Sequence, residues 1–221
     1  MTMAAVIPAY NERVHIADVV RRTRAKIDNV LVVDDGSSDA TAERARDAGA
    51  EVIVHPQNRG KGESIKTGLR YWLDRQIDFV IILDADGQHR PEEIERFVAA
   101  AVSAALPKLI LGNRMNDIQS MPLVRRIVNG YMSRKISRVC GQKIPDTQCG
   151  FRMVHRDLIP NLLNGAERFD YETEMLIVAS RKGFRIESVP ISTVYSDEVS
   201  SIHPVRDTIR FFNLMRRYQK L

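Results

Sequence analysis

The sequence predicts one α/β domain, in which a mostly parallel sheet is covered by helices on both faces. Three observations support this class. The expected strands are short and nearly all apolar, as strands buried on both faces are. Segments with helical spacing separate them, and polar and glycine residues follow each strand. The 221 residues suit one large domain, and we find no repeat, low-complexity tract or linker that would divide them.

The first half of the chain alternates regularly between the two kinds of element. Apolar runs predict strands at residues 3–7, 30–33, 51–54, 79–83 and 108–111. Apolar residues at helical spacing predict helices at 12–26, 39–48, 61–74 and 91–105. Ser38 or Asp39 is the expected N-cap of the second helix, and Pro91 suits the N-terminus of the fourth. Ligands of such sheets bind beyond the carboxyl ends of the strands.

The second half is less regular. It predicts a helix at 123–139, a loop entering a strand at 146–154, a helix at 171–182, a strand at 185–189 and a final helix at 205–220. One arc of the final helix carries its basic residues, which are Arg206, Arg210, Arg216, Arg217 and Lys220. This helix is either a core helix with a solvated basic face or an interfacial helix resting on acidic lipid.

Composition indicates a soluble protein that binds anions. Hydrophobic residues make up 44% and charged residues 28%, as in ordinary globular proteins. No apolar run approaches the ~20 residues that span a bilayer, and the N-terminus does not read as a signal peptide. Cys140 and Cys149 are expected to be reduced thiols in a cytoplasmic protein. The formal charge of +5 favours nucleotides, phosphates, acidic lipid or nucleic acid as partners.

Two carboxylates follow the fourth expected strand in the stretch "LDADGQ". Asp84 and Asp86 lie one residue apart at a strand end, so both can face one ion, and Gln88 can add an amide oxygen. Such hard oxygen ligands suit Mg²⁺ or Mn²⁺. The alternative is a solvated turn that caps the helix beginning at Pro91. An EF-hand loop is excluded, because the glycine is misplaced and a strand precedes the loop.

The stretch "NRGKGES" resembles a phosphate-binding loop without matching one. It is not a Walker A sequence, and the chain has no GxGxxG after its first strand. Dinucleotide binding and ordinary NTPase chemistry therefore lose support. A glycine-rich turn carrying Lys61 can still approach a phosphate.

Several motifs together resemble the family 2 glycosyltransferases, which have the GT-A fold, and most of all their dolichyl- and polyprenyl-phosphate branch. The resemblance covers nearly the whole chain. Its motifs are "VIPAYNE" at 6–12, "VVDDGSSDAT" at 32–41, "NRGKGESIKTG" at 58–68, "LDADGQHRPEEI" at 83–94, "GNR" at 112–114, "DTQCGFRM" at 146–153, "FDYETEML" at 169–176 and "VPI" at 189–191.

The resemblance implies a donor site for a UDP- or GDP-sugar. Residues after the first two strands would bind the nucleotide or shape its loop, namely Pro8, Ala9, Tyr10, Asn11, Glu12, Asp34, Asp35, Gly36 and Ser37. Asp84, Asp86 and Gln88 would hold a Mg²⁺ or Mn²⁺ ion on the donor diphosphate. Lys61 would approach that diphosphate.

The segment 114–143 is strongly basic and is the expected acceptor side. Its residues either form a solvated helix face or bind a phosphate acceptor, and Arg114, Arg125 and Arg126 are the candidates for that contact. A lipid phosphate is already ionised and needs no general base. A hydroxyl acceptor would need a carboxylate base, with Asp146, Glu172 and Glu174 as candidates. Their alternative role is helix capping or an ion pair with Arg152.

The segment "SDEVSSIHPVRDTIRF" at 196–211 contains two more candidates. It looks similar to bacterial relatives with a serine-histidine-x-proline version of this motif. His203 would close over the metal or the diphosphate, unless it is structural. Arg206 is a candidate contact for the diphosphate.

The sequence thus predicts a metal-dependent inverting glycosyltransferase, with residues 1–114 binding the nucleotide-sugar and 115–221 binding the acceptor. Polyprenyl phosphate is the expected acceptor, at the cytoplasmic membrane face, through peripheral contact or a separate membrane partner. The alternatives are a hydroxyl acceptor on a cell-surface glycan, or a sugar nucleotidyltransferase. The latter should carry a GxGTR-type loop, which "PAYNERV" is not. A nucleic-acid binder would not account for the acidic "DADGQ".

Overall fold

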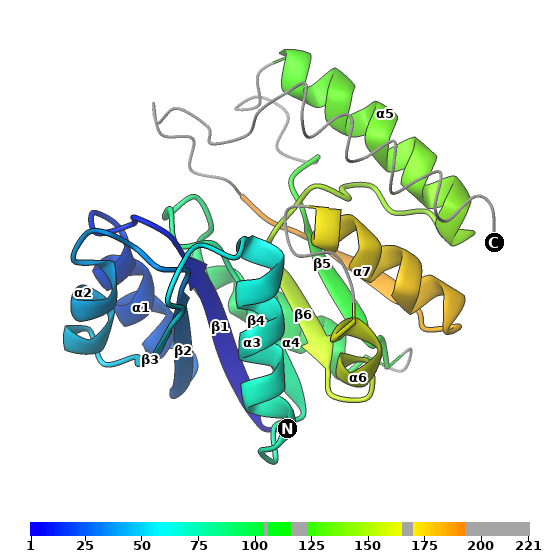
Figure 1. Ribbon diagram of the computed structural model, residues 1–221. Helices are drawn as coiled ribbons and strands as arrows, with labels where there is room; N and C mark the ends of the chain where they lie inside the picture. Colours follow the sequence, from blue (N-terminus) through cyan, green and yellow to red (C-terminus); the bar gives the residue numbers. More distant parts are fainter. Residues whose placement is uncertain (104–105, 116–122, 165–169, 193–221) are drawn as a thin grey trace.

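The computed structural model describes residues 1–103, 106–115, 123–164 and 170–192. Its centre is a seven-stranded sheet in the order β3-β2-β1-β4-β6-β5-β7, with helices on both faces (Figure 1). The predicted α/β class is confirmed. The strands are β1 (Met3–Ala9), β2 (Asn29–Asp34), β3 (Glu51–Val54), β4 (Phe79–Ile82), β5 (Leu109–Asn113), β6 (Arg152–His155) and β7 (Ile186–Pro190).

The sheet is parallel except for one strand. β6 runs antiparallel to both of its neighbours, pairing Val80 of β4 with Val154 and Ile110 of β5 with Met153. The expectation of a strand after the "DTQCG" loop is confirmed. The reversal means that β6 begins where β4 and β5 end, so the loop before it reaches the same edge of the sheet as the loops after the parallel strands.

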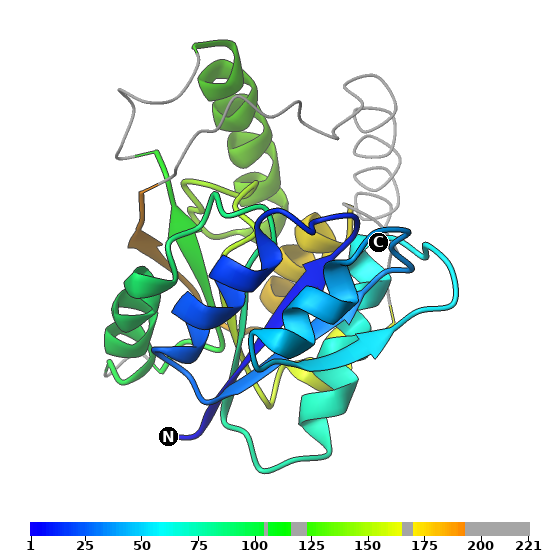
Figure 2. The same ribbon diagram turned by 90° about the vertical axis from the view of Figure 1, so that its left-hand side faces the viewer.

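Helices cover the two faces of the sheet, as Figures 1 and 2 show from two sides. They are α1 (Ile16–Arg24), α2 (Thr41–Asp47), α3 (Lys61–Leu73), η1 (Pro91–Glu93), α4 (Ile94–Ala101), α5 (Leu123–Cys140), α6 (Ile159–Leu162) and α7 (Asp170–Arg181). Because strand side chains alternate between faces, β1 contributes to two cores. Ala4 and Val6 pack with residues of α3, α6 and α7, whereas Ala5 and Ile7 pack with residues of α1 and α4.

Two expected helices have other bounds in the structure, and one short helix was not expected. The helix expected at 12–26 begins only at Ile16, because the chain turns at Asn11, whose φ is +57°. The helix expected at 91–105 begins as a 3₁₀ turn at Pro91 and ends at Ala101. The short helix α6 was not expected. The expected final helix at 205–220 lies outside the described residues.

Within the residues described here, no helix combines the length and the apolar character needed to cross a membrane.

α5 lies beyond the sheet, on the side where the carboxyl end of β5 points (Figure 1). Its inner side is closed by buried residues, which are Asn129, Ser133, Ile136 and Cys140.

Candidate donor and acceptor site

The loops after β1 and β2 are bound to each other by side-chain hydrogen bonds. The Asn11 side-chain oxygen accepts from the backbone N–H of Ser38 at 2.9 Å, and the Asn11 N–H donates to Ser37 Oγ at 2.9 Å. The Glu12 N–H donates to Thr41 Oγ1 at 2.8 Å. These contacts give the two loops one fixed shape, while Tyr10 keeps 48% of its surface exposed.

Asp34 and Gly36 shape the turn after β2. The buried Asp34 carboxylate accepts from both the N–H and the hydroxyl of Ser37, at 2.9 and 2.5 Å. Gly36 has a φ of +73°, and a Cβ there would lie 2.8 Å from the backbone carbon of Gln57. A side chain at this position would therefore push the turn away from the loop after β3.

Asp35 fixes the loop that leads to Lys61. Its carboxylate accepts backbone hydrogen bonds from Arg59 at 2.9 Å and Gly60 at 2.7 Å, and lies 2.8 Å from His55 Nδ1. His55 Nε2 lies 3.0 Å from Thr67 Oγ1 on α3. The expected contact of Asp35 with base or ribose stays a prediction. In this structure Asp35 holds the start of α3 beside β2.

His89 closes the loop that carries the candidate metal ligands Asp84, Asp86 and Gln88. Its Nδ1 accepts from the backbone N–H of Asp84 at 3.1 Å, and its ring stacks on Phe151. Burial lowers the pKa of His89 to about 4, so the ring is neutral at pH 7. Within the loop, Asp86 Oδ1 accepts from the Gln88 N–H at 2.9 Å. The loop is thus ordered before any ligand binds.

Lys61 lies between two carboxylates from different elements. Its ammonium nitrogen is 2.6 Å from Asp84 Oδ1 and 3.1 Å from Glu172 Oε1. Gly150 completes the contact, because a Cβ there would lie 2.7 Å from Asp84 Oδ2 and 3.1 Å from Glu172 Oε1. Burial raises the pKa of Asp84, but the Lys61 ammonium outweighs it, and the pKa falls to about 2. Three segments far apart in sequence therefore meet at one small charged centre.

The residues present fit a divalent ion held jointly with a ligand. In the described part of the chain, no group of three or more His, Cys, Asp or Glu residues forms a metal site. Mg²⁺, however, commonly binds through one or two carboxylates together with substrate phosphates. Asp84 and Asp86 offer that pair at the end of β4, and Asp84 already accommodates the cationic Lys61.

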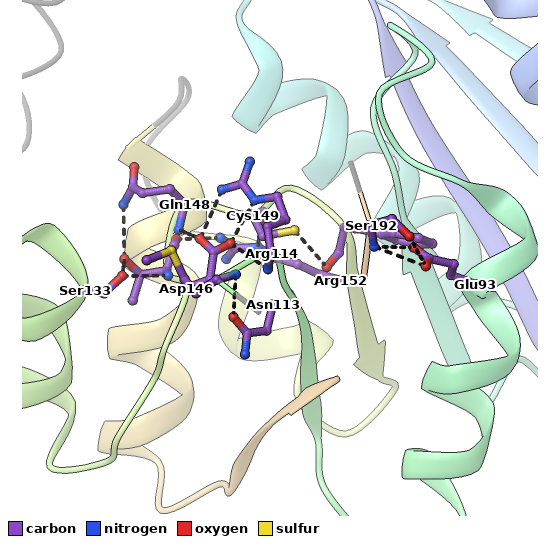
Figure 3. A network of polar contacts seen from close by, with 12 residues as sticks. Glu93, Asn113, Arg114, Ser133, Asp146, Gln148, Cys149, Arg152 and Ser192 are labelled. Carbon is purple, nitrogen blue, oxygen red and sulfur yellow. Dashed lines mark hydrogen bonds and ion pairs between the residues drawn. The ribbon is translucent and has the colours of Figure 1, made fainter. Parts of the chain in front are cut away.

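Arg114 is held in a bidentate ion pair with Asp146 (Figure 3). Its Nε and Nη2 donate to the two carboxylate oxygens at 2.7 and 3.0 Å. Asp146 also accepts backbone hydrogen bonds from Arg114 and Gln148, both at 3.1 Å, and its side chain has no exposed surface. This setting opposes the expected role of Asp146 as a general base, because its carboxylate is enclosed and already bonded to four N–H groups. Asp146 instead orients Arg114.

Arg152 binds backbone carbonyls and not the acidic side chains considered for it. It is fully buried, and its guanidinium donates to the carbonyls of Cys149 at 2.8 Å, Thr147 at 3.1 Å and Glu172. The expected ion pair of Arg152 with Asp146, Glu172 or Glu174 is thus not what its hydrogen bonds show. Arg152 ties the loop before β6 to the first turn of α7, which places Gly150 and Glu172 against Asp84.

A separate contact fixes the chain where it leaves β7. The Glu93 carboxylate accepts from the N–H of Ser192 at 3.0 and 3.1 Å and from its hydroxyl at 2.8 Å (Figure 3). Glu93 is buried and also pairs with Arg96 at 3.0 Å. The acidic first turn after "DADGQHRP" therefore anchors a strand end 99 residues away.

The remaining expected residues are distributed as follows. Pro8 and Ala9 end β1. Arg126 is exposed on α5, and the Arg125 side chain, His203 and Arg206 lie outside the described residues. Glu174 is buried beside Tyr171; burial raises the pKa of that tyrosine, and the charge of Glu174 raises it further.

Sequence reasoning gave no role to His89 and Gly150, and it gave Arg152 only the role of an ion-pair partner for the acidic candidates. All three lie inside the family motifs, and Glu172 was expected only as a candidate base, together with Asp146 and Glu174. Their roles depend on contacts with Asp84 and with α7, which motif spacing does not reveal. His89, in the same motif as the acidic pair, was the one signal that the sequence offered.

Comparison with known proteins identifies the family. The family model for glycosyl transferase family 2 matches residues 4–163. An uncharacterized protein of Methanocaldococcus jannaschii is 32% identical over 87% of this chain and 81% of its own length. The UDP-N-acetylglucosamine–dolichyl-phosphate N-acetylglucosaminyltransferase of Methanococcus voltae is 29% identical, over 87% and 85%. The undecaprenyl-phosphate mannosyltransferase of Micrococcus luteus is 28% identical, over 88% and 84%.

Solved structures agree with the fold. Glucosyl-3-phosphoglycerate synthase from Mycobacterium tuberculosis, in complex with Mn²⁺, UDP and phosphoglyceric acid, superposes with a TM-score of 0.75 at 18% identity. The match covers 99% of this chain and 77% of that one. The same enzyme with Mg²⁺ and UDP gives a TM-score of 0.72 at 20% identity. The chain belongs to glycosyl transferase family 2 and is a glycosyltransferase with a GT-A-like fold.

Proposed function

We propose that this family 2 glycosyltransferase transfers a sugar from UDP or GDP to the phosphate of a polyprenyl phosphate, with inversion at the anomeric carbon. The observation that carries the proposal is the charged centre at the end of β4. There Asp84 lies beside Lys61 and near the Arg114–Asp146 pair, and Asp86 follows it in the same loop. Relatives named for dolichyl-phosphate and undecaprenyl-phosphate acceptors support the choice of acceptor.

The donor half, residues 1–114, would hold the nucleotide-sugar between the loops after β1 and β2. Asp84 and Asp86, with Gln88, would hold a Mg²⁺ or Mn²⁺ ion, which supplies charge neutralisation to the diphosphate when bound. Structures of a fold neighbour contain UDP with either ion. Lys61 lies on the same centre and would contact the diphosphate as a cation.

The acceptor half would position a phosphate oxygen against the anomeric carbon. That oxygen forms the new bond, and the bond to the nucleoside diphosphate breaks. Because the acceptor oxygen is already ionised, positioning and charge neutralisation carry the rate without a general base. Arg114 is suited to this task, since Asp146 fixes its guanidinium plane. The engagement of Asp146 with Arg114 and of Glu172 with Lys61 disfavours a hydroxyl acceptor.

The first test measures the donor. Thermal stability is recorded with UDP, GDP, CDP and dTDP, each with and without MnCl₂. One nucleotide should raise the melting temperature by roughly 2–4 °C or more at ~100 times its dissociation constant, and only with metal. Asp86→Ala should remove this shift and the transfer activity while its unliganded melting temperature stays close to that of the parent. A folded protein that responds to no nucleotide would refute the proposal.

The outward face of α5 supports contact with a membrane that holds the acceptor. Ile127, Val128 and Tyr131 are 64%, 47% and 50% exposed. Arg134 and Arg138 are exposed on the same side of the helix, and α5 contains no acidic residue. Exposed apolar groups next to arginines are typical of helices that rest on anionic lipid.

The second test uses phosphatidylglycerol vesicles that contain polyprenyl phosphate, and it measures both binding of the protein to the vesicles and sugar transfer to the lipid. The double variant Arg134→Ala/Arg138→Ala should bind these vesicles about tenfold or more weakly, since each basic residue near an anionic surface contributes about 1 kcal/mol. Lys182→Ala/Arg185→Ala, in the exposed turn between α7 and β7, removes the same charge outside α5 and is the control. Transfer to unphosphorylated polyprenol or to a glycan hydroxyl, with none to the phosphate, would replace this acceptor with the alternative.

A further inference from the structure

The position of Lys61 raises a question about how the metal enters. An ammonium group 2.6 Å from Asp84 Oδ1 occupies part of the space that a metal ion on that oxygen would need. The second carboxylate, Glu172, lies 3.1 Å from the same nitrogen. The Lys61 side chain is only 17% exposed, and the two carboxylates are 24% and 13% exposed. The three groups therefore form a nearly closed cluster with one cation and two anions.

The surrounding chain holds this cluster in place from three sides. Asp35 binds the N–H groups of Arg59 and Gly60, which immediately precede Lys61. Gly150 leaves just enough room for the two carboxylates to approach. Burial lowers the pKa of Lys61, but the attraction of Asp84 and Glu172 outweighs it and raises that pKa, so Lys61 is charged at every physiological pH.

We propose that Lys61 is the internal counter-cation of Asp84 and Glu172, and that it makes metal binding depend on the nucleoside diphosphate. This inference rests on the proposed function. Without nucleotide, Lys61 neutralises the carboxylate that the metal needs, so the metal alone binds weakly. When a diphosphate arrives, its oxygens supply further anionic ligands for the metal. They also offer the ammonium group of Lys61, on its flexible four-carbon stem, an alternative partner.

The experiment titrates MnCl₂ alone into the metal-free protein by calorimetry. Lys61→Met leaves Asp84 and Glu172 without their cation, so it should bind Mn²⁺ about tenfold or more tightly than the parent. Lys61→Arg keeps the charge and should bind as weakly as the parent. Glu172→Gln removes an anion from the centre and should not bind more tightly. Lys108→Met is the matched control, because Lys108 is also half-buried and paired with an aspartate, Asp157, at 2.8 Å.

A thermal measurement gives an independent readout. Lys61→Met and Lys61→Gln should melt below the parent without metal, because two neighbouring carboxylates then repel each other. MnCl₂ alone should restore their stability and should change the parent little. With UDP or GDP present, the parent should bind Mn²⁺ tightly. In Lys61→Met and Lys61→Gln, the nucleotide should strengthen Mn²⁺ binding much less than it does in the parent.

The outcomes separate the inference from the proposed function. If the parent responds to Mn²⁺ with UDP or GDP, but Lys61→Met binds Mn²⁺ alone no more tightly than the parent, only the counter-cation role is wrong. Tight binding of Mn²⁺ alone by the parent would overturn it as well. If the parent shows no response to Mn²⁺ with any nucleotide, the proposed donor site itself is wrong.

Discussion

The proposed donor and acceptor edges of the site each fix one loop through a buried side chain, and these two side chains have opposite charge. On the donor side, carboxylates accept hydrogen bonds from backbone N–H groups, as Asp35 does from Arg59 and Gly60. On the acceptor side, a guanidinium donates to backbone carbonyls, as Arg152 does to Thr147 and Cys149. Both devices order a loop before ligand binding. The donor edge is thereby lined with acids, which suits a cation, and the acceptor edge is supported by buried positive charge.

The acceptor side should lose more stability than the donor side when the buried side chain that fixes its loop is replaced. Arg152→Met would leave the carbonyls of Thr147, Cys149 and Glu172 without their donor inside the protein. We expect the free energy of unfolding, measured by urea titration, to fall by about 3–5 kcal/mol. Arg152→Lys keeps the charge but not the fork of donors and should lose an intermediate amount.

Arg185→Met is the control for this comparison, because Arg185 is exposed and pairs only with Glu187 at the surface in the described contacts. It should change stability by less than about 0.5 kcal/mol. A similarly small effect of Arg152→Met would show that the loop before β6 is held by other contacts. The contrast between the two edges would then fail.

On the donor side, the buried His89 should make the stability of the protein depend on pH. His89 is neutral in the folded chain, with a pKa of about 4 against an ordinary value of 6.5, because it is buried. The unfolded chain therefore binds more protons between pH 6.5 and 4. Stability is fully present above pH 6.5 and is lost as the pH falls towards 4, by about 3 kcal/mol from this group.

His89→Asn isolates this contribution. Its side-chain oxygen can still accept the Asp84 N–H but does not titrate in this range. The free energies of unfolding of both proteins, measured by urea titration in EDTA at several pH values, should converge as the pH falls from 6.5 to 4. Parallel curves for the two proteins across that window would show that His89 does not hold the acidic loop through its neutral ring.

Local pattern was sufficient for the elements and for the edge at which the site lies. Apolar runs ending in acids placed Asp84 and Asp86 at the carboxyl end of β4, and the glycine turn placed Lys61 at the start of α3. It failed where the chain departs from periodicity. The amphipathic pattern of α1 continues back to Glu12, but contacts of Asn11 with residues 37 and 38 hold that segment as a turn.

Motifs alone could not predict which residues far apart in sequence contact each other. Arg114 and Asp146 were assigned to different chemical tasks, yet they form one ion pair across 32 residues. The family resemblance predicts a nucleotide contact for Asp35, but no motif predicted that its carboxylate also binds the turn before Lys61. Local sequence shows which side chains carry charge, but only the packed chain decides which opposite charge each one meets.

The reversed strand β6 limits how this enzyme can be recombined. The proposed donor half ends near residue 114, yet β4 takes β6 from the proposed acceptor half as its neighbour. A chimaera that joins this donor half to the acceptor half of a relative must therefore preserve the pairing of Phe79–Ile82 with Arg152–His155. A shift of that pairing by one residue would turn the buried side chains of β6 to the wrong face. The units that can be exchanged between relatives are thus the loops at the sheet edge, and not the two halves that the motifs suggest.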